Sequence, residues 1–318
     1  MTFVRTVLSD ITPAQLGRCY AHEHVIIGPS FTTHVCPEFL LDDVDRAAAE
    51  LADFRRAGGG AMVDSMPCDS GRDILRLAEV SRRSGVHLIC PTGLHLAKYY
   101  PPGHWGETLG AAELAALFVA DITEGVDAFD YGAPVVRRTP HRAGVIKVAT
   151  ERQFTARDEK LLAAAAEAHC RTGCPILTHT EQGELALEQA TRLRELGVDL
   201  RHVCLSHVDR RPDPGYHREV LSTGVRLEYD SAFRWPAERG NPTRDLLLAL
   251  LPEFPDQLML GMDAARRSYW RSYGGAPGLV FLLETFVPEL RAAGLSDELL
   301  SRVLLATPAS TYAFARAA

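Results

Sequence analysis

The chain has 318 residues, of which 46% are hydrophobic and 24% are charged, and its formal net charge is -7. This composition is typical of a soluble globular protein and excludes a disordered or fibrous chain. Because a mildly acidic chain is a poor electrostatic match for nucleic acid or an anionic membrane, we expect neither as a partner.

The N-terminal segment, residues 1–18, is expected to form a lead-in hairpin. Arg5, Asp10 and Pro13 interrupt its apolar residues, a pattern that fits neither a signal peptide nor a membrane span. The seven cysteines are scattered and form no recognisable zinc or disulfide framework. These features predict a cytoplasmic protein with reduced thiols.

Beyond this segment, short apolar runs rich in β-branched residues alternate with longer segments whose apolar residues recur at helical spacing. Strands are predicted, in chain order, at residues 19–27, 61–66, 87–92, 144–149, 175–180, 202–208, 225–229 and 258–262. Helices are predicted at residues 43–56, 73–84, 111–124, 156–171, 184–195, 214–222, 243–251 and 277–293, with a closing helical segment over 296–318.

Each predicted strand is followed by a predicted helix, which is the repeating unit of a parallel sheet. No glycine-rich phosphate loop follows the first strand, so the pattern favours a closed (β/α)8 barrel, the TIM barrel, over an open doubly wound sheet. Because no linker or further repeat interrupts this pattern, residues 1–318 are expected to form a single α/β domain.

The first predicted strand carries His22 and His24 near its end. Alternate side chains of a barrel strand share a face, so both imidazoles are expected to point into the barrel interior. The same spacing also occurs in pairs of hydrogen-bonded structural histidines. Their position at the carboxyl end of the strand favours a metal site over that alternative.

Three further side chains come at the carboxyl ends of predicted strands five, six and eight: His179, His207 and Asp263. These ends surround one active-site mouth in a barrel. Each residue alone could be a hydrogen-bonded core histidine or the cap of a following helix. Because four imidazoles and a carboxylate at one rim would repel or desolvate one another without a cation, we interpret them together as metal ligands.

Lys147 lies in the middle of the otherwise apolar fourth strand, where an unpaired charge is costly. One interpretation is a buried salt bridge to a neighbouring carboxylate. The other is that a desolvated, partly neutral amine takes up carbon dioxide. The resulting carbamate is an anion whose two oxygens could bridge two metal ions.

This ordered set of residues resembles the phosphotriesterase-like family of the amidohydrolase superfamily over nearly the whole chain. The resemblance implies that the two strand-one histidines and the strand-eight aspartate hold one divalent metal ion, and that the histidines of strands five and six hold a second. It also implies that carboxylated Lys147 and a solvent hydroxide bridge the two ions. Histidine and carboxylate ligands suit Zn2+, and Mn2+, Co2+ or Fe2+ fit the same ligands.

The resemblance implies hydrolysis by attack of the metal-bridging hydroxide. One ion polarises the substrate carbonyl or phosphoryl oxygen, and the pair lowers the pKa of the bridging water from about 15.7 toward about 7. Asp263 is the expected catalytic residue, because it can accept the proton of the hydroxide and pass it to the leaving group.

Side chains able to bind an anion follow the last two predicted strands, with Arg234 after strand seven and Arg266 and Tyr269 after strand eight. These loops are the usual phosphate cradle of barrels, although a solvated, arginine-rich loop is an alternative interpretation. The positions resemble the branch of the family that hydrolyses phosphorylated sugar lactones, except that Arg234 stands where a lysine is expected. Tyr99, after strand three, is expected to line the opposite wall.

We therefore expect a lactonase that opens a small, phosphorylated sugar lactone, and hence an anionic small-molecule substrate. Organophosphate triester or acyl-homoserine lactone hydrolysis is the alternative within the family. A mononuclear deaminase on the same fold is a further alternative, but it would leave Lys147 in strand four unexplained. A barrel that binds a ligand without catalysis is another, but it would not need all six predicted metal ligands. A homodimer is the default expectation for assembly.

Overall fold

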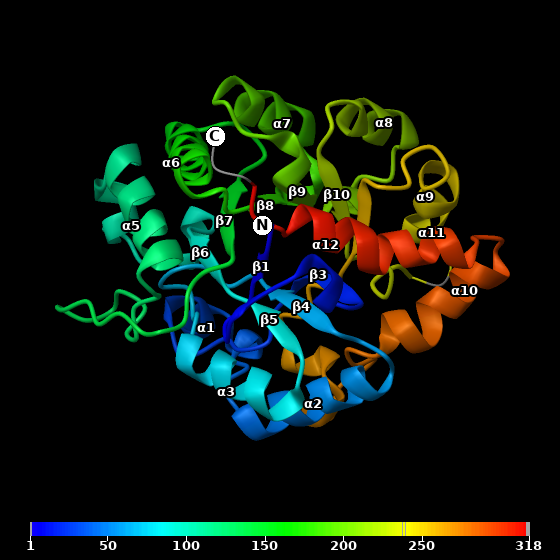
Figure 1. Ribbon diagram of the computed structural model, residues 1–318, viewed down its shortest axis with the longest axis horizontal. Coiled ribbons are helices and arrows are strands. Elements are labelled where there is room, and N and C mark those ends of the chain that lie inside the picture. The colour runs from blue at the N-terminus through cyan, green and yellow to red at the C-terminus, as the bar shows by residue number, and fades with distance from the viewer. Residues whose placement is uncertain (1, 237, 239, 316–318) are drawn as a thin grey trace.

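The computed structural model describes residues 2–236, 238 and 240–315 of the chain (Figure 1). All eight predicted barrel strands are confirmed; most are shorter than predicted, the fourth is shifted by one residue, and the third is divided at Cys90 into two short strands. The barrel strands are β3 (Cys19–Glu23), β4 (Ala61–Asp64), β5 (His87–Ile89), β6 (Pro91–Gly93), β7 (Val145–Thr150), β8 (Ile176–Thr180), β9 (Val203–Ser206), β10 (Arg226–Tyr229) and β11 (Leu258–Leu260).

The strands are parallel and follow the chain order around the barrel. Strands β3 to β5 form one hydrogen-bonded group and β6 to β11 form another. The amides of Met262 and Asp263, just after β11, both donate to the carbonyl of His22 in β3, with N···O distances of 3.3 and 3.1 Å. These bonds join the last strand to the first, so the fold is the (β/α)8 barrel that the sequence predicts.

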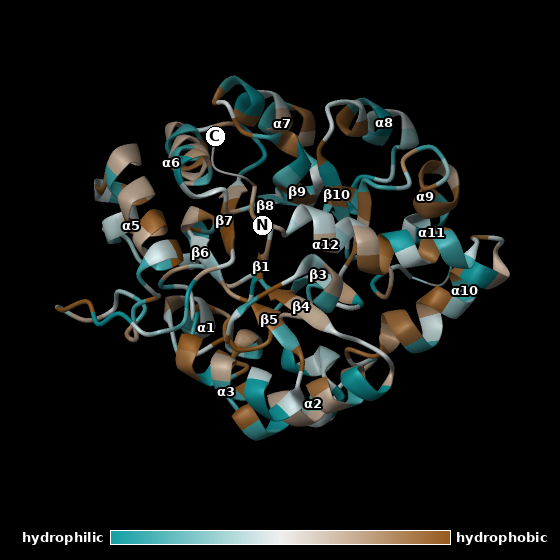
Figure 2. Ribbon diagram, in the orientation of Figure 1, coloured by the Kyte–Doolittle hydropathy of each residue, from teal (hydrophilic) through white to brown (hydrophobic). Residues whose placement is uncertain are grey.

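Helices surround the strands (Figure 1), and hydrophobic and hydrophilic residues alternate along them as expected for helices that pack on one side (Figure 2). The longer helices are α2 (Val44–Arg56), α3 (Ile74–Ser84), α5 (Ala111–Thr123), α6 (Ala156–Thr172), α7 (Ala186–Glu195), α8 (Pro214–Ser222), α9 (Pro242–Leu250) and α10 (Val287–Ala292). Short helices are α1 (Phe31–Val35), α4 (Trp105–Thr108), α11 (Asp297–Ser301) and α12 (Thr307–Thr311).

Two helix starts differ from the prediction by two residues or more. The helix predicted from residue 184 begins at Ala186, because Leu185 has a φ of 60° and cannot continue a right-handed helix. The helix predicted from residue 277 becomes helical only after Gly278, which has a φ of 84°. In both places a left-handed backbone residue, which an apolar spacing pattern does not reveal, separates the loop from the helix.

The two chain ends meet at the end of the barrel opposite the carboxyl ends of the strands. The predicted N-terminal hairpin is confirmed, with β1 (Val4–Arg5) antiparallel to β2 (Asp10–Ile11). The closing helical segment, predicted over 296–318, ends at Thr311, and residues 316–318 lie outside the described part. It stops early because the amide of Phe314 donates to the carbonyl of Phe3 at 2.8 Å, which draws the chain out of the helix.

The barrel interior is apolar toward this closed end. Its side chains come from nearly every strand, and Tyr312 caps them by donating a hydrogen bond from its hydroxyl to the carbonyl of Ala21 at 2.7 Å. Each such buried aliphatic side chain contributes about 1.5–3 kcal/mol of burial free energy. The interior residues include Cys19, Ala21, Ala61, Val63, Ile89, Val145, Leu177, Cys204 and Met259.

Gly93 allows β6 to approach β7 closely at the level of Lys147, its partner in the register. Its φ is 107°, and a Cβ atom there would lie 1.9 Å from the carbonyl oxygen of Lys147. Only glycine tolerates both conditions. No helix in the described part of the chain is long and apolar enough to cross a membrane.

Candidate metal centre and substrate cavity

A cavity of about 620 Å³ lies at the carboxyl ends of the barrel strands. It brings together nine of the ten predicted site residues. The predicted ligands that line it are His22, His24, His179, His207 and Asp263, and the predicted substrate-binding residues that line it are Tyr99, Arg234, Arg266 and Tyr269. The tenth, Lys147, is fully buried in β7 and does not line the cavity.

A bulge in β3 turns His22 and His24 toward the cavity. Cys19 and Ala21 face the apolar interior, so strict alternation would point His22 outward. The register between β3 and β4 shifts between Tyr20 and Glu23, which inserts one extra residue in β3. The extra residue reverses the alternation, and both histidines therefore line the cavity.

Asp263 forms a compact cluster with these two histidines. Its Oδ1 atom lies 3.0 Å from Nε2 of His24 and 3.6 Å from Nε2 of His22. Burial opposes ionisation of Asp263, but Arg234 and the hydrogen bond from His24 hold its pKa well below the usual value. The three side chains present nitrogen and oxygen atoms close enough together to hold one metal ion.

The backbone of Asp263 is held in an uncommon conformation. Its φ is 48°, in the left-handed region. The buried carboxylate of Glu23 fixes it from both sides by accepting hydrogen bonds from the amides of Met262 at 2.7 Å and Ala264 at 3.2 Å. A backbone conformation of this kind persists only where the surroundings enforce it, which is common at functional sites.

Carboxylates orient the other two histidines. Nδ1 of His207 donates to Asp230 through a short hydrogen bond, and Nε2 of His179 lies 3.0 Å from Glu181. A histidine that binds a metal through one ring nitrogen donates its other N–H group in this way. The two rings, 4.5 Å apart between centroids, can therefore offer Nε2 of His207 and Nδ1 of His179 to a cation.

Burial keeps these imidazoles neutral. It lowers the pKa of His179 to about 4 and that of His207 to about 3, and it lowers the pKa of His22 well below the usual value. A neutral ring has a free lone pair, which a metal ligand requires.

Lys147 is the most unusual charged residue of the barrel. Its Nζ atom is buried and has no hydrogen-bond partner among the residues that the structure describes. Burial lowers its pKa to about 8, so a minor part of the amine population is neutral near neutral pH. The predicted alternative, a salt bridge, is not formed with any carboxylate that the structure describes. The orphaned amine, the neutral histidines and the carboxylate together fit a metal centre in which Lys147 reacts with carbon dioxide.

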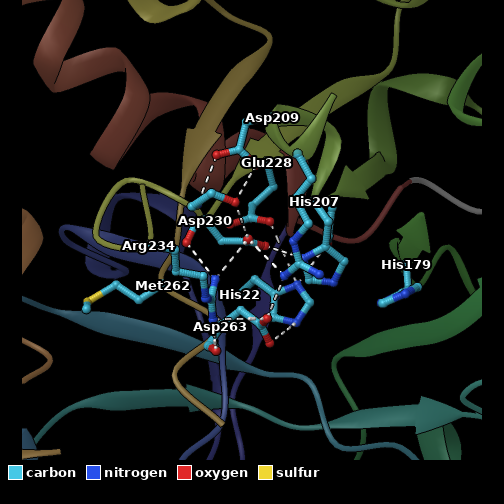
Figure 3. A network of polar contacts seen from close by, with 12 residues as sticks. His22, His179, His207, Asp209, Glu228, Asp230, Arg234, Met262 and Asp263 are labelled. Atoms are coloured by element: carbon cyan, nitrogen blue, oxygen red, sulfur yellow. Dashed lines mark hydrogen bonds and ion pairs between the residues drawn. The ribbon is translucent and has the colours of Figure 1, made fainter. Parts of the chain in front are cut away.

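Sequence reasoning missed Asp230, which belongs to the polar network of Figure 3, and Arg210. Both organise the cavity wall. Nη2 of Arg210 donates to Asp230 at 3.1 Å and to Asp263 at 2.8 Å. Arg234 contacts the same two carboxylates, at 3.2 Å each. Asp230 directly follows β10, just as Asp263 directly follows the predicted eighth strand. Arg210 comes three residues after His207. Position after a strand was therefore the sequence signal that could have identified both residues.

Removal of the Asp230 carboxylate is expected to weaken metal binding about 10- to 100-fold, because His207 loses its charged orienting partner. The variant is Asp230→Asn, and the measurement is metal content per chain after equilibrium dialysis against buffered metal. Asp209→Asn is the matched control, since buried Asp209 bonds Ser231 and Thr243 and no histidine ring. Equal metal affinity in the two variants would contradict this role of Asp230.

The remaining predicted residues form the outer wall of the cavity. The guanidinium of Arg234 lies over the rings of Phe233 at 4.6 Å and Tyr269 at 5.5 Å, and that of Arg266 lies over Phe39 at 5.5 Å. Arg266 makes no ion pair with any residue in the described part of the chain. It therefore has donors free for an anion in the cavity.

The model of the phosphotriesterase family matches residues 2–312. A phospho-furanose lactonase from Mycoplasmopsis agalactiae is 33% identical to this chain, over 98% of this chain and 92% of the relative. A lactonase structure from Listeria monocytogenes has a TM-score of 0.89 and 28% identity, covering 99% of this chain and all of that one.

The phosphotriesterase homology protein from Escherichia coli, solved with phosphate in its active site, has a TM-score of 0.83 and 28% identity, covering 94% of this chain and 99% of that one. These likenesses and the family match extend over nearly the whole chain. The fold agrees with them, and the chain belongs to the phosphotriesterase family.

Proposed function

We propose that this protein is a binuclear metal-dependent hydrolase that opens a small, phosphorylated sugar lactone. The observation that carries the proposal is one cavity with a histidine and carboxylate cluster at its base and arginines in its wall. The relatives named as lactonases support the lactone substrate. A cytoplasmic location and a homodimeric assembly stay predictions from the sequence.

One ion would be held by His22, His24 and Asp263, the second by His179 and His207, and carboxylated Lys147 would join the two. When bound, the ions would polarise the lactone carbonyl and lower the pKa of the attacking water. Zn2+ suits these ligands best, and Mn2+, Co2+ or Fe2+ are the other candidates.

The protein's own groups then move the proton and hold the substrate. The carboxylate of Asp263 accepts the proton that the attacking water loses and delivers it to the ring oxygen as the ester bond breaks. The products are one hydroxyl group and one carboxylic acid, which releases its proton to solvent and becomes a carboxylate. Arg210 and Arg234 keep Asp263 ionised and oriented, because both donate to its Oδ2 atom at 2.8 and 3.2 Å.

The phosphate group of the substrate would bind beside Arg234, Arg266 and Tyr269. Arg234 and Tyr269 already have partners within the protein. Arg234 forms ion pairs with two carboxylates, and its guanidinium lies over the ring of Tyr269. Of these three, Arg266 offers a guanidinium that forms no ion pair with the described residues, which suits bidentate binding of phosphate. The Escherichia coli relative, solved with phosphate in its active site, supports an anionic group in this cavity.

Removal of the Arg266 guanidinium tests the substrate assignment. Arg266→Met is expected to lower kcat/KM for a five-membered sugar lactone phosphate about 10- to 100-fold, because a charge-assisted hydrogen bond contributes about 1.5–3 kcal/mol. The unphosphorylated lactone should be hydrolysed more slowly than the phosphorylated one, and at the same rate by the wild-type protein and by Arg266→Met. The measurement is the steady-state rate on both lactones with metal-loaded protein.

The matched control is Arg267→Met, because Arg267 is the neighbouring arginine but bonds the carbonyl of Leu40 and does not line the cavity. An equal effect of Arg266→Met on both lactones would contradict a phosphate site. Faster wild-type hydrolysis of an organophosphate triester or an acyl-homoserine lactone than of any sugar lactone would replace the proposed substrate with that alternative.

A further inference from the structure

His95 lies in the cavity wall, and neither the predicted ligand set nor the proposed mechanism uses it. It follows β6, is buried, and lines the cavity beside His179 and Tyr99. Its ring centroid lies 5.1 Å from that of His179 and 4.4 Å from that of Tyr99. A histidine so close to a proposed metal ligand has two possible roles, as a further ligand or as a group that contacts the substrate.

The backbone around His95 is fixed on several sides. Its amide donates to the hydroxyl of Tyr100 at 2.8 Å, and that hydroxyl donates to the carbonyl of Cys68 at 3.1 Å. Its carbonyl accepts a hydrogen bond from Arg157. Because both backbone groups are bonded and the ring is packed between two others, the imidazole is held in one orientation toward the cavity.

The proton position on the ring follows from one local contact. The amide of Leu96 donates a hydrogen bond to Nδ1 of His95 at 2.7 Å. Nδ1 must therefore carry a lone pair, and in a neutral imidazole the proton then resides on Nε2. Nε2 has no hydrogen-bond partner among the described residues, so the cavity wall presents an unpaired N–H donor.

This tautomer excludes His95 as a metal ligand. His207 and His179 each bond a carboxylate through one ring nitrogen, which leaves a lone pair on the other. His95 is the reverse case, because its cavity-facing nitrogen carries the proton and its other nitrogen is an acceptor. An oxygen atom of a bound substrate can accept this hydrogen bond.

The barrel topology indicates which oxygen this is. His95 follows the third barrel strand and Arg234 the seventh, so they stand four strands apart, on opposite sides of the mouth. If the phosphate lies beside the arginines, the far side of the lactone ring faces His95. In a five-membered sugar lactone that side carries the carbonyl, close to the ligand histidines, and the hydroxyl on the next carbon, C2.

We infer that His95 determines substrate specificity by donating a hydrogen bond from Nε2–H to the C2 hydroxyl of the lactone, an inference that rests on the proposed lactonase function. A site built around a fixed donor rejects an analogue that lacks the acceptor, since the donor is then left buried and unpaired. The protein therefore distinguishes 2-hydroxy lactones from 2-deoxy lactones.

The test compares a five-membered sugar lactone phosphate with its 2-deoxy counterpart. Wild-type protein is expected to prefer the 2-hydroxy lactone about 10- to 100-fold in kcat/KM. His95→Phe, which keeps a planar ring but has no donor, should lose this preference while retaining the wild-type metal content. His95→Gln, whose amide can donate from a similar position, should recover part of it.

His104→Phe is the matched control, because His104 is a buried histidine of the same loop region that bonds Asp69 and does not line the cavity. It should keep the wild-type preference. Loss of metal from His95→Phe, or an equal loss of rate on both lactones, would overturn the inference.

Binding separates this inference from the proposed function. Titration calorimetry of metal-loaded protein with the 2-hydroxy acid that lactone opening would yield, and with its 2-deoxy analogue, requires no turnover. If wild-type protein hydrolyses no lactone, the proposed function fails, and the inference still predicts tighter binding of the 2-hydroxy acid that His95→Phe abolishes. Equal binding of the two acids by wild-type protein would reject it.

Discussion

Replacement of Lys147 by methionine is expected to lower kcat/KM about 10³-fold, or about 4 kcal/mol of transition-state stabilisation, and to reduce the metal content below two ions per chain. The reason is that the carbamate would supply the anion between the two ions, and methionine cannot react with carbon dioxide. Elemental analysis and steady-state kinetics on the same preparation measure both effects.

Stability distinguishes this role from a structural one. The amine of Lys147 is buried without a hydrogen-bond partner in the described part of the chain, so an apolar side chain of similar length should not lower the melting temperature of the metal-free protein. A structural ion pair would give the opposite result, a loss of about 3–5 kcal/mol when one partner is removed.

Lys160→Met is the control, because Lys160 donates to the backbone carbonyls of residues 106, 107 and 109 and does not line the cavity. Wild-type protein should also incorporate ¹³C-labelled carbon dioxide at one lysine, a signal that ¹³C NMR detects and Lys147→Met lacks. Full activity and two ions per chain in Lys147→Met would exclude a carbamate at this residue.

The fold was predictable because its signals are periodic. Eight apolar strands, each followed by an amphipathic helix, lead to one closed parallel barrel, and the structure confirms every strand. The errors lie at element ends such as Leu185 and Gly278, where a left-handed residue delays the helix. Such backbone conformations depend on local hydrogen bonds and packing, which hydrophobic periodicity does not report.

The residues near the proposed ligands were harder to predict than the ligands themselves. His22 and His24 face the cavity only because of a bulge in β3, which strict alternation would not produce. Asp230 and Arg210 act through contacts with residues far away in the chain, so neither belongs to a local sequence motif. The proton on Nε2 of His95 follows from one hydrogen bond to its ring, which only coordinates reveal.

Substitution of Asp263 by asparagine is expected to lower kcat about 10³-fold or more, since general-base catalysis alone contributes about 10²- to 10⁴-fold. Asparagine keeps a carbonyl oxygen that can face His24 and a metal ion, but it cannot accept a proton. The effect should therefore appear in kcat at saturating metal, with a much smaller change in KM.

The surroundings of Asp263 make this variant informative. Its negative charge is bonded by Arg210 and Arg234 at 2.8 and 3.2 Å, so asparagine leaves two guanidinium groups short of a partner, and some loss of stability is expected. Asp263→Glu retains the charge but displaces it, and should show a smaller loss of kcat. If Asp263→Asn binds two ions per chain and keeps a tenth or more of the wild-type kcat, the proton acceptor must be another group, and the carboxylate of Asp263 serves only to bind metal and orient the arginines.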